Sequence, residues 1–132
     1  MASIRKELRT NASVDAVWAA IADIGALDTR LVPGFVTKTV LEGDARRVTF
    51  ANGLAVREPI ITIDATEHRL VWGSEGGVTT HYNASVQALA ERDGTRVIWI
   101  ADFLPNESAP KVDAAMTAGM KAMQGALDRL AS

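Results

Sequence analysis

Glu58 is the acidic residue whose setting most clearly suggests chemistry. It lies in the segment NGLAVREPI (52–60), where the Asn-Gly pair is a hairpin turn signal and predicts that a strand follows. Side chains alternate along a strand, so Glu58 shares a face with the apolar residues Leu54, Val56 and Ile60. Burial raises the pKa of a carboxyl group, which then donates or accepts a proton near neutral pH.

Two interpretations of Glu58 are open. In the first, the carboxylate faces a cavity and contacts a ligand. In the second, it forms a structural ion pair, either with Arg57 reached around the strand edge or with an arginine of another strand. A buried charge is costly unless it is paired, so one of the two must hold if the strand face is interior.

Three aromatic residues accompany Glu58 on predicted inward faces. Tyr82 lies on the apolar face of the alternating strand HYNASVQALA, and His81 lies on its polar face. A buried tyrosine hydroxyl needs a partner, which is Glu58, a ligand oxygen or the backbone. Trp72 and Trp99 are expected to point inward as core or as ligand contacts. The facing of Trp99 is open, because the residues on the other face of its strand, such as Ile98, are almost as apolar.

Other common site chemistries find no support in the residues. The two histidines stand apart from any carboxylate cluster, and there are no cysteines, so neither a metal site nor a Ser-His-Asp triad is expected. No glycine-rich turn leads into a helix that could receive a phosphate. The sequence therefore predicts no metal and no cofactor.

Length and charge narrow the class of protein. A chain of 132 residues predicts a single domain over 1–132. The net charge of -2, with scattered basic residues, argues against a nucleic-acid partner. No window approaches 18 consecutive apolar residues, and the N-terminus lacks the pattern of a signal peptide, so we expect no membrane span and a cytoplasmic location.

The elements that position these residues follow a simple order. A short strand comes first, then a helix capped by Asn11 or Ser13 and a second short helical turn over 26–31. About six strands fill residues 35–104, separated by short turns typical of an antiparallel meander. A long helix follows, with Ser108 as its expected cap. This order predicts an α+β fold in which a curved antiparallel sheet wraps around the C-terminal helix.

The final helix carries an apolar stripe that favours a cavity. Residues spaced by three or four positions form it: Val112, Met116, Met120, Met123, Leu127 and Leu130. Methionines and small neighbours make an adaptable surface that fills space incompletely. The opposite, outer face of the sheet also has apolar members, namely Ile61, Ile63, Ile98 and Ile100. If exposed together they form a patch, which makes a homodimer an expectation.

The order of segments resembles a known superfamily. SVDAVWAAIADIGALD, Pro-Gly at 33–34, VREPIITID, RLVWGSEGG, TRVIWIADFLP and the final helix are similar to the START-like helix-grip superfamily (SRPBCC), in its polyketide cyclase/dehydrase and lipid transport branch. The resemblance implies a deep apolar cavity between the sheet and the last helix. In the related plant abscisic-acid receptors, pocket residues match the positions of Glu58, Tyr82 and Trp72. Fold alone does not choose among the ligands of the superfamily.

Together these observations predict a protein that binds a small hydrophobic ligand, such as a lipid or polyketide. The expected ligand contacts are Val56, Glu58, Trp72, Tyr82, Trp99, Met116, Met120 and Met123. One alternative is a cyclase/dehydrase-type enzyme with Glu58 as general acid or base and Tyr82 polarising a carbonyl. Another is a partner-binding regulator whose cavity is vestigial.

Overall fold

The computed structural model describes residues 1–131 and has the predicted order of elements. The strands are β1 (Ala2–Thr10), β2 (Val36–Glu42), β3 (Ala45–Phe50), β4 (Ala55–Asp64), β5 (Arg69–Gly73), β6 (His81–Glu91) and β7 (Gly94–Leu104). The helices are α1 (Val14–Ala22), the short turns η1 (Ile24–Ala26), η2 (Leu27–Leu31) and η3 (Asn106–Ser108), and α2 (Ala109–Leu130).

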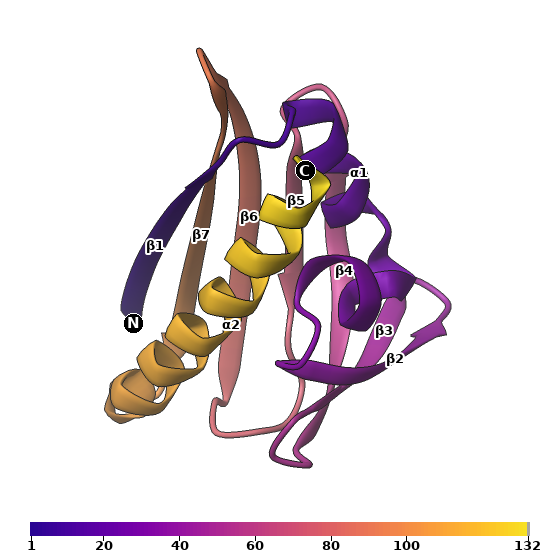
Figure 1. The fold of residues 1–132 in the computed structure, drawn as a ribbon. Coiled ribbons are helices and arrows are strands. Elements are labelled where there is room, and N and C mark those ends of the chain that lie inside the picture. Colours follow the sequence, from indigo (N-terminus) through magenta and orange to yellow (C-terminus); the bar gives the residue numbers. More distant parts are fainter. Residues whose placement is uncertain (132) are drawn as a thin grey trace.

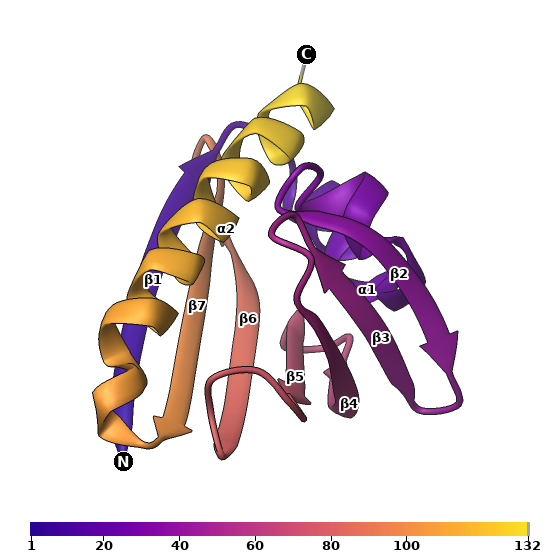
Figure 2. The ribbon, with the colours of Figure 1, turned by 90° about the horizontal axis from the view of Figure 1, so that it is seen from below.

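The strands form one curved antiparallel sheet around α2. Their order is β1-β7-β6-β5-β4-β3-β2, so every pair except β1–β7 joins strands that are consecutive in the chain. Figure 1 shows α2 crossing the sheet, and Figure 2 shows the sheet curling about it, with β1, β7 and β6 on one side and β3 and β2 on the other. The predicted helix-grip fold is confirmed.

The first helix begins where its capping residue predicts. The Ser13 hydroxyl accepts a hydrogen bond from the backbone N–H of Ala16 at 3.2 Å, so Ser13, and not Asn11, caps α1. Asp15 lies in the first turn, where the helix dipole favours a negative charge. Two further short turns, η1 and η2, occupy the segment before the Pro-Gly pair. This region closes one end of the curved sheet.

Ser108 stands at the N-terminus of α2 as expected, but it does not cap the helix. Its side chain makes no capping bond, and its hydroxyl donates instead to the carbonyl oxygen of Val78 at 2.8 Å. The start of α2 is thereby tied to the β5–β6 loop. Pro110 lies in the first turn, where its missing N–H has no cost.

The apolar stripe of α2 is buried along most of its length. Its buried members are Val112, Met116, Gly119, Met120, Met123, Ala126 and Leu127. Leu130, which the spacing placed on this stripe, is 45 % exposed. Gly119 has a packing reason: a Cβ atom at this position would lie 2.8 Å from Trp99 Cζ3 and 3.2 Å from Phe35 Cε2. The glycine lets these two rings approach the helix backbone.

Trp99, and not Ile98, faces the interior on the last strand, β7. Trp99 is buried with its alternating neighbours Val97, Ala101 and Phe103, whereas Ile98 and Ile100 point to the outer face. On that outer face, the residues of β1 and β6 that stand opposite Ile98 and Ile100 are polar or charged.

The four isoleucines expected on the outer face do not form one patch, and a bulge between Ile60 and Thr62 places Ile63 opposite the inward-facing Leu70. Ile98 and Ile100 lie on β7, and Ile61 and Ile63 lie on β4, with β5 and β6 between the two strands. Three strand spacings separate β7 from β4, which amounts to about 14 Å. Ile61 and Ile63 are about half exposed. The homodimer therefore stays a prediction, without the continuous apolar face on which it was based.

Within the part of the chain that the structure describes, no helix combines the length and the apolar character needed to cross a bilayer. α2 has the length, but polar and charged residues alternate with its apolar stripe.

Candidate functional site

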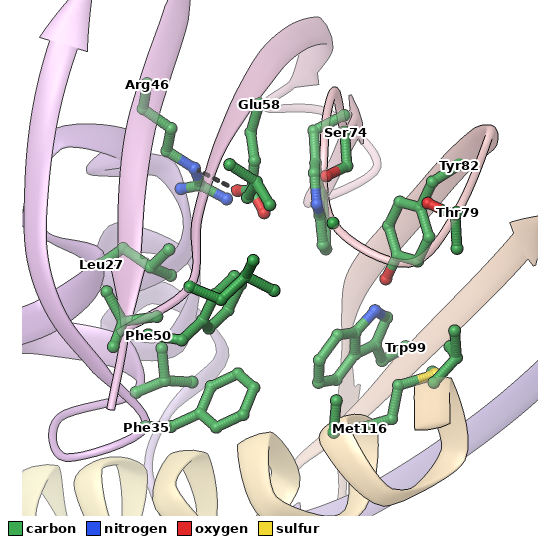
Figure 3. A pocket seen from close by; sticks show the side chains of 18 of the residues that line it. Leu27, Phe35, Arg46, Phe50, Glu58, Ser74, Thr79, Tyr82, Trp99 and Met116 are labelled. Atoms are coloured by element: carbon green, nitrogen blue, oxygen red, sulfur yellow. Dashed lines mark hydrogen bonds and ion pairs between the residues drawn. The ribbon is translucent and has the colours of Figure 1, made fainter. Parts of the chain in front are cut away.

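A cavity of about 150 Å³ lies between the concave face of the sheet and α2 (Figure 3). Seven of the eight residues expected to contact a ligand line it: Val56, Glu58, Trp72, Tyr82, Trp99, Met116 and Met123. Met120 is buried, but it is not among the residues that line the cavity. The methionine spacing correctly gave the inward face of α2, but it could not show which methionines reach the cavity. The ligand-binding role of all eight stays a prediction.

Glu58 forms a buried ion pair with an arginine of the neighbouring strand. Arg46 Nε donates to Glu58 Oε1 at 2.9 Å, and the two side chains are only 2 % and 9 % exposed. The residues face each other directly in the β3–β4 register. Of the two readings of Glu58, the ion pair with an arginine from another strand is thus present. Arg46 and Glu58 also both line the cavity, so a paired Glu58 is compatible with a contact between its carboxylate and a ligand.

The surroundings of Arg46 hold its guanidinium in place. Its Nη1 donates to the carbonyl oxygen of Ile24 at 3.3 Å, and its Cζ atom lies 5.7 Å from the centre of the Trp72 ring. The guanidinium bonds to a carboxylate and also contacts an aromatic ring, and its planar fork of donors suits this combination better than the ammonium of lysine. The pair therefore forms a rigid polar end of an otherwise apolar cavity.

Burial dominates the protonation of Glu58. It raises the pKa of this carboxyl above its ordinary value, and the lowering by the Arg46 charge, the Arg46 hydrogen bond and the Trp72 indole offsets this only in part. For the ionised form of this carboxyl, the loss of hydration therefore outweighs the attraction to Arg46.

Tyr82 projects from β6 into the cavity, with its hydroxyl near the indole of Trp99 (Figure 3). Burial raises the pKa of this phenol, and the nearby negative charge of Glu58 raises it further, while the Trp99 indole N–H, which is directed at the phenol oxygen, lowers it. Glu58 acts on Tyr82 as a charge and not as the hydrogen-bond partner that the sequence left open. A phenol in this setting stays protonated and can donate a hydrogen bond.

Several lining residues were not expected from the sequence. Phe35 and Phe50 meet edge to face, with ring centres 5.3 Å apart, and form the wall opposite Trp99. Leu27 completes this wall from the short turns after α1. Lys111, an exposed residue in the first turn of α2, also belongs to the lining. Phe35 follows the Pro-Gly pair, and that position was the signal available for it.

The comparisons with known proteins agree on the fold. The model of a family described as polyketide cyclase/dehydrase and lipid transport matches residues 1–132. No curated protein matches the chain. Among solved structures, the protein XoxI from Bacillus cereus has a TM-score of 0.85 at 20% identity, covering 96% of each chain. Ara h 8.0201 has a TM-score of 0.73 at 19% identity, covering 96% of this chain and 97% of its own.

A third similar structure is that of an enzyme. Truncated norcoclaurine synthase from Thalictrum flavum has a TM-score of 0.74 at 22% identity, covering 98% of this chain and 92% of its own. At such identities these structures establish the shared fold alone. The family match spans the whole chain and includes every residue of the cavity described above. The chain belongs to the polyketide cyclase/dehydrase and lipid transport family.

Proposed function

We propose that this protein binds a small hydrophobic ligand in the cavity between the sheet and α2. The observation that carries the proposal is the cavity itself, which is walled by aliphatic, methionine and aromatic side chains and has one buried ion pair at its end. Ligand pockets commonly combine apolar walls with a few placed polar groups. The description of the family, which names polyketides and lipid transport, supports this general class of ligand.

The Arg46–Glu58 pair favours binding over catalysis. A general acid or base must reach the proton that it transfers, and one oxygen of Glu58 is already occupied by Arg46 at 2.9 Å. The similarity to norcoclaurine synthase does not reverse this preference, because one fold serves both binding proteins and enzymes.

Thermal unfolding with a panel of lipids and aromatic polyketides tests the proposal. A ligand present at one hundred times its Kd adds about 2.7 kcal/mol to the stability of the folded state, which raises Tm by roughly 10 °C in a domain of this size. In the variant Val56→Phe the added ring enters the cavity, so the same ligand should lose most of this effect.

Ile61→Phe is the matched control. It adds the same type of ring on the same strand, but at a side chain that is 53 % exposed and does not line the cavity. This variant should respond to the ligand like the unmodified protein. The proposal fails if no member of the panel raises Tm, or if a ligand that does so acts equally on Val56→Phe.

A further inference from the structure

The indole nitrogen of Trp99 is a buried donor that completes no hydrogen bond of ordinary geometry, although the Tyr82 hydroxyl lies close to it. Three side-chain atoms within residues 1–131 are buried and lack a hydrogen-bond partner, namely Thr39 Oγ1, Arg96 Nε and Trp99 Nε1. Of these residues, only Trp99 lines the cavity. An indole N–H can only donate, and buried donors in folded proteins are nearly always satisfied. Because the Tyr82 hydroxyl does not satisfy this N–H with good geometry, the cavity is the place from which a better acceptor for Trp99 can come.

A second donor faces the same point. Tyr82 comes from the adjacent strand β6, and its hydroxyl and the Trp99 indole nitrogen point toward each other across one side of the cavity (Figure 3). The tyrosine O–H rotates to suit an acceptor, whereas the indole N–H has a fixed direction. One oxygen with two lone pairs can accept from both groups at once.

We propose that the ligand is a small neutral carbonyl compound, such as a ketone, ester or quinone, whose oxygen accepts hydrogen bonds from Trp99 Nε1 and the Tyr82 hydroxyl. This inference rests on the proposed function and specifies its ligand class. The apolar body of the ligand then lies toward Phe35 and Phe50, on the opposite wall.

The charges around the two donors select a neutral oxygen. Glu58 places a negative charge close enough to Tyr82 to disfavour its ionised form, and the same repulsion acts on a carboxylate held at that hydroxyl. The positive charge of Arg46 is already paired with Glu58. Lys111 is the other cation of the lining, but it is exposed, so an anionic head group would be drawn away from Trp99.

The size of the cavity limits the enclosed part of the ligand. An apolar protein cavity of about 150 Å³ holds a molecule the size of benzene. The cavity here has the same volume, about 150 Å³. One ring with a carbonyl substituent is therefore a suitable probe, and three compounds of nearly equal shape separate the effects: acetophenone, ethylbenzene and benzoate.

The test compares the affinities of these probes in the protein and in two variants. Trp99→Phe and Tyr82→Phe keep an aromatic ring and each remove one donor. The preference for acetophenone over ethylbenzene, expressed as the ratio of their Kd values, should fall by about fivefold in each variant, which corresponds to one net hydrogen bond. Comparing ratios removes the difference in water solubility between the two probes.

Nuclear magnetic resonance supplies a direct readout. Protein labelled with ¹⁵N gives one indole N–H signal for each of its three tryptophans, and the signal lost in Trp99→Phe identifies that of Trp99. Acetophenone should move this signal downfield, and ethylbenzene should not. Trp18 lies on α1 and does not line the cavity, so its signal is the internal control.

Each contrary result has a distinct meaning. An unchanged ratio in both variants, with ethylbenzene and acetophenone still bound, overturns the carbonyl site and leaves the proposed function standing. Tightest binding of benzoate, lost in Lys111→Met, overturns it in favour of an anionic ligand. Failure of all three probes and of the wider panel overturns both proposals. Far-ultraviolet circular dichroism confirms that each variant is folded, and Tyr82→Phe serves if Trp99→Phe is not.

Discussion

Separating the two charges of the Arg46–Glu58 pair should destabilise the protein in two different ways. The variant Arg46→Met removes the cation and keeps a side chain of similar length, whereas Glu58→Leu removes the anion. The side chains of Arg46 and Glu58 are only 2 % and 9 % exposed, so the charge that remains in either variant has little access to water. Breaking a buried pair in this way typically costs 3–5 kcal/mol.

The cost of Arg46→Met has an upper limit set by pH. The unpaired Glu58 carboxyl escapes its penalty by taking up a proton, which at about pH 7 costs roughly 3.4 kcal/mol relative to an unfolded group with a pKa of 4.5. At about pH 5 the same escape costs roughly 0.7 kcal/mol. We therefore expect Arg46→Met to lose about 3 kcal/mol near neutral pH and to recover most of this loss near pH 5.

Glu58→Leu should behave differently, because an arginine cannot shed its proton at these pH values. The uncompensated Arg46 guanidinium stays charged, so the loss of about 3–5 kcal/mol should persist at pH 5. The double variant removes both charges and replaces them with apolar groups of similar volume. Its stability should return to within about 1 kcal/mol of the original or exceed it.

Urea unfolding followed by circular dichroism measures these differences. Tryptophan fluorescence is less suitable, because Trp72 contacts Arg46 and its signal would change for local reasons. The matched control is the neighbouring pair Arg47–Glu42, which has a similar distance of 2.8 Å but side chains that are 51 % and 36 % exposed. Its double-mutant cycle should give a much smaller coupling than that of the Arg46–Glu58 pair, because solvent screens exposed charges. The reasoning is refuted if the buried and exposed pairs give equal coupling, or if Arg46→Met is equally destabilised at both pH values.

Three further predictions concern the rest of the fold. Burial raises the pKa of Glu58, so the charged form of this carboxyl is disfavoured in the folded state. The free energy of unfolding, measured with urea and compared with that of the double variant, should therefore fall as pH rises above 4.5. Gly119→Ala should lower the free energy of unfolding by about 1–3 kcal/mol in the same assay, because its Cβ would meet Trp99 at 2.8 Å. Gly125→Ala on the same helix is the control: its Cβ meets only a flexible side-chain end, so this variant should gain about 0.5–1 kcal/mol of stability. Ser108→Ala should cost about 1 kcal/mol by removing the bond to the β5–β6 loop, and faster amide hydrogen exchange confined to that loop would show where it acts.

Periodicity was sufficient for the architecture. The alternation of apolar residues along the strands and the three-to-four spacing along α2 each select one face, and the structure uses those faces almost throughout. The local turn chemistry was informative as well, as the Ser13 cap shows. Ser108 is the exception, because a nearby backbone carbonyl of another loop competed for its hydroxyl. Local signals cannot report such tertiary partners.

The partner of Glu58 depended on a detail that the sequence does not contain. An Asn-Gly pair read as a two-residue turn places Ala51 opposite Leu54, and that register puts Arg47 opposite Glu58. In the structure the loop is longer, with Thr49 opposite Ala55, so Arg46 faces Glu58 instead. A shift of one residue moves each side chain to the other face of the sheet.

This shift determines which arginine enters the cavity, since either register places one opposite Glu58. With Arg47 opposite Glu58, Arg47 would have pointed inward beside the carboxylate, and Arg46 would have pointed outward. With the observed register, Arg46 points inside and pairs with Glu58, and the Trp99 N–H and the Tyr82 hydroxyl are further donors on the cavity wall. Glu58 was the residue that first suggested a site, and in the structure one of its oxygens is held by Arg46. In the proposed carbonyl site, polar recognition falls to Tyr82 and Trp99, two residues for which the strand pattern alone does not distinguish core from ligand contact.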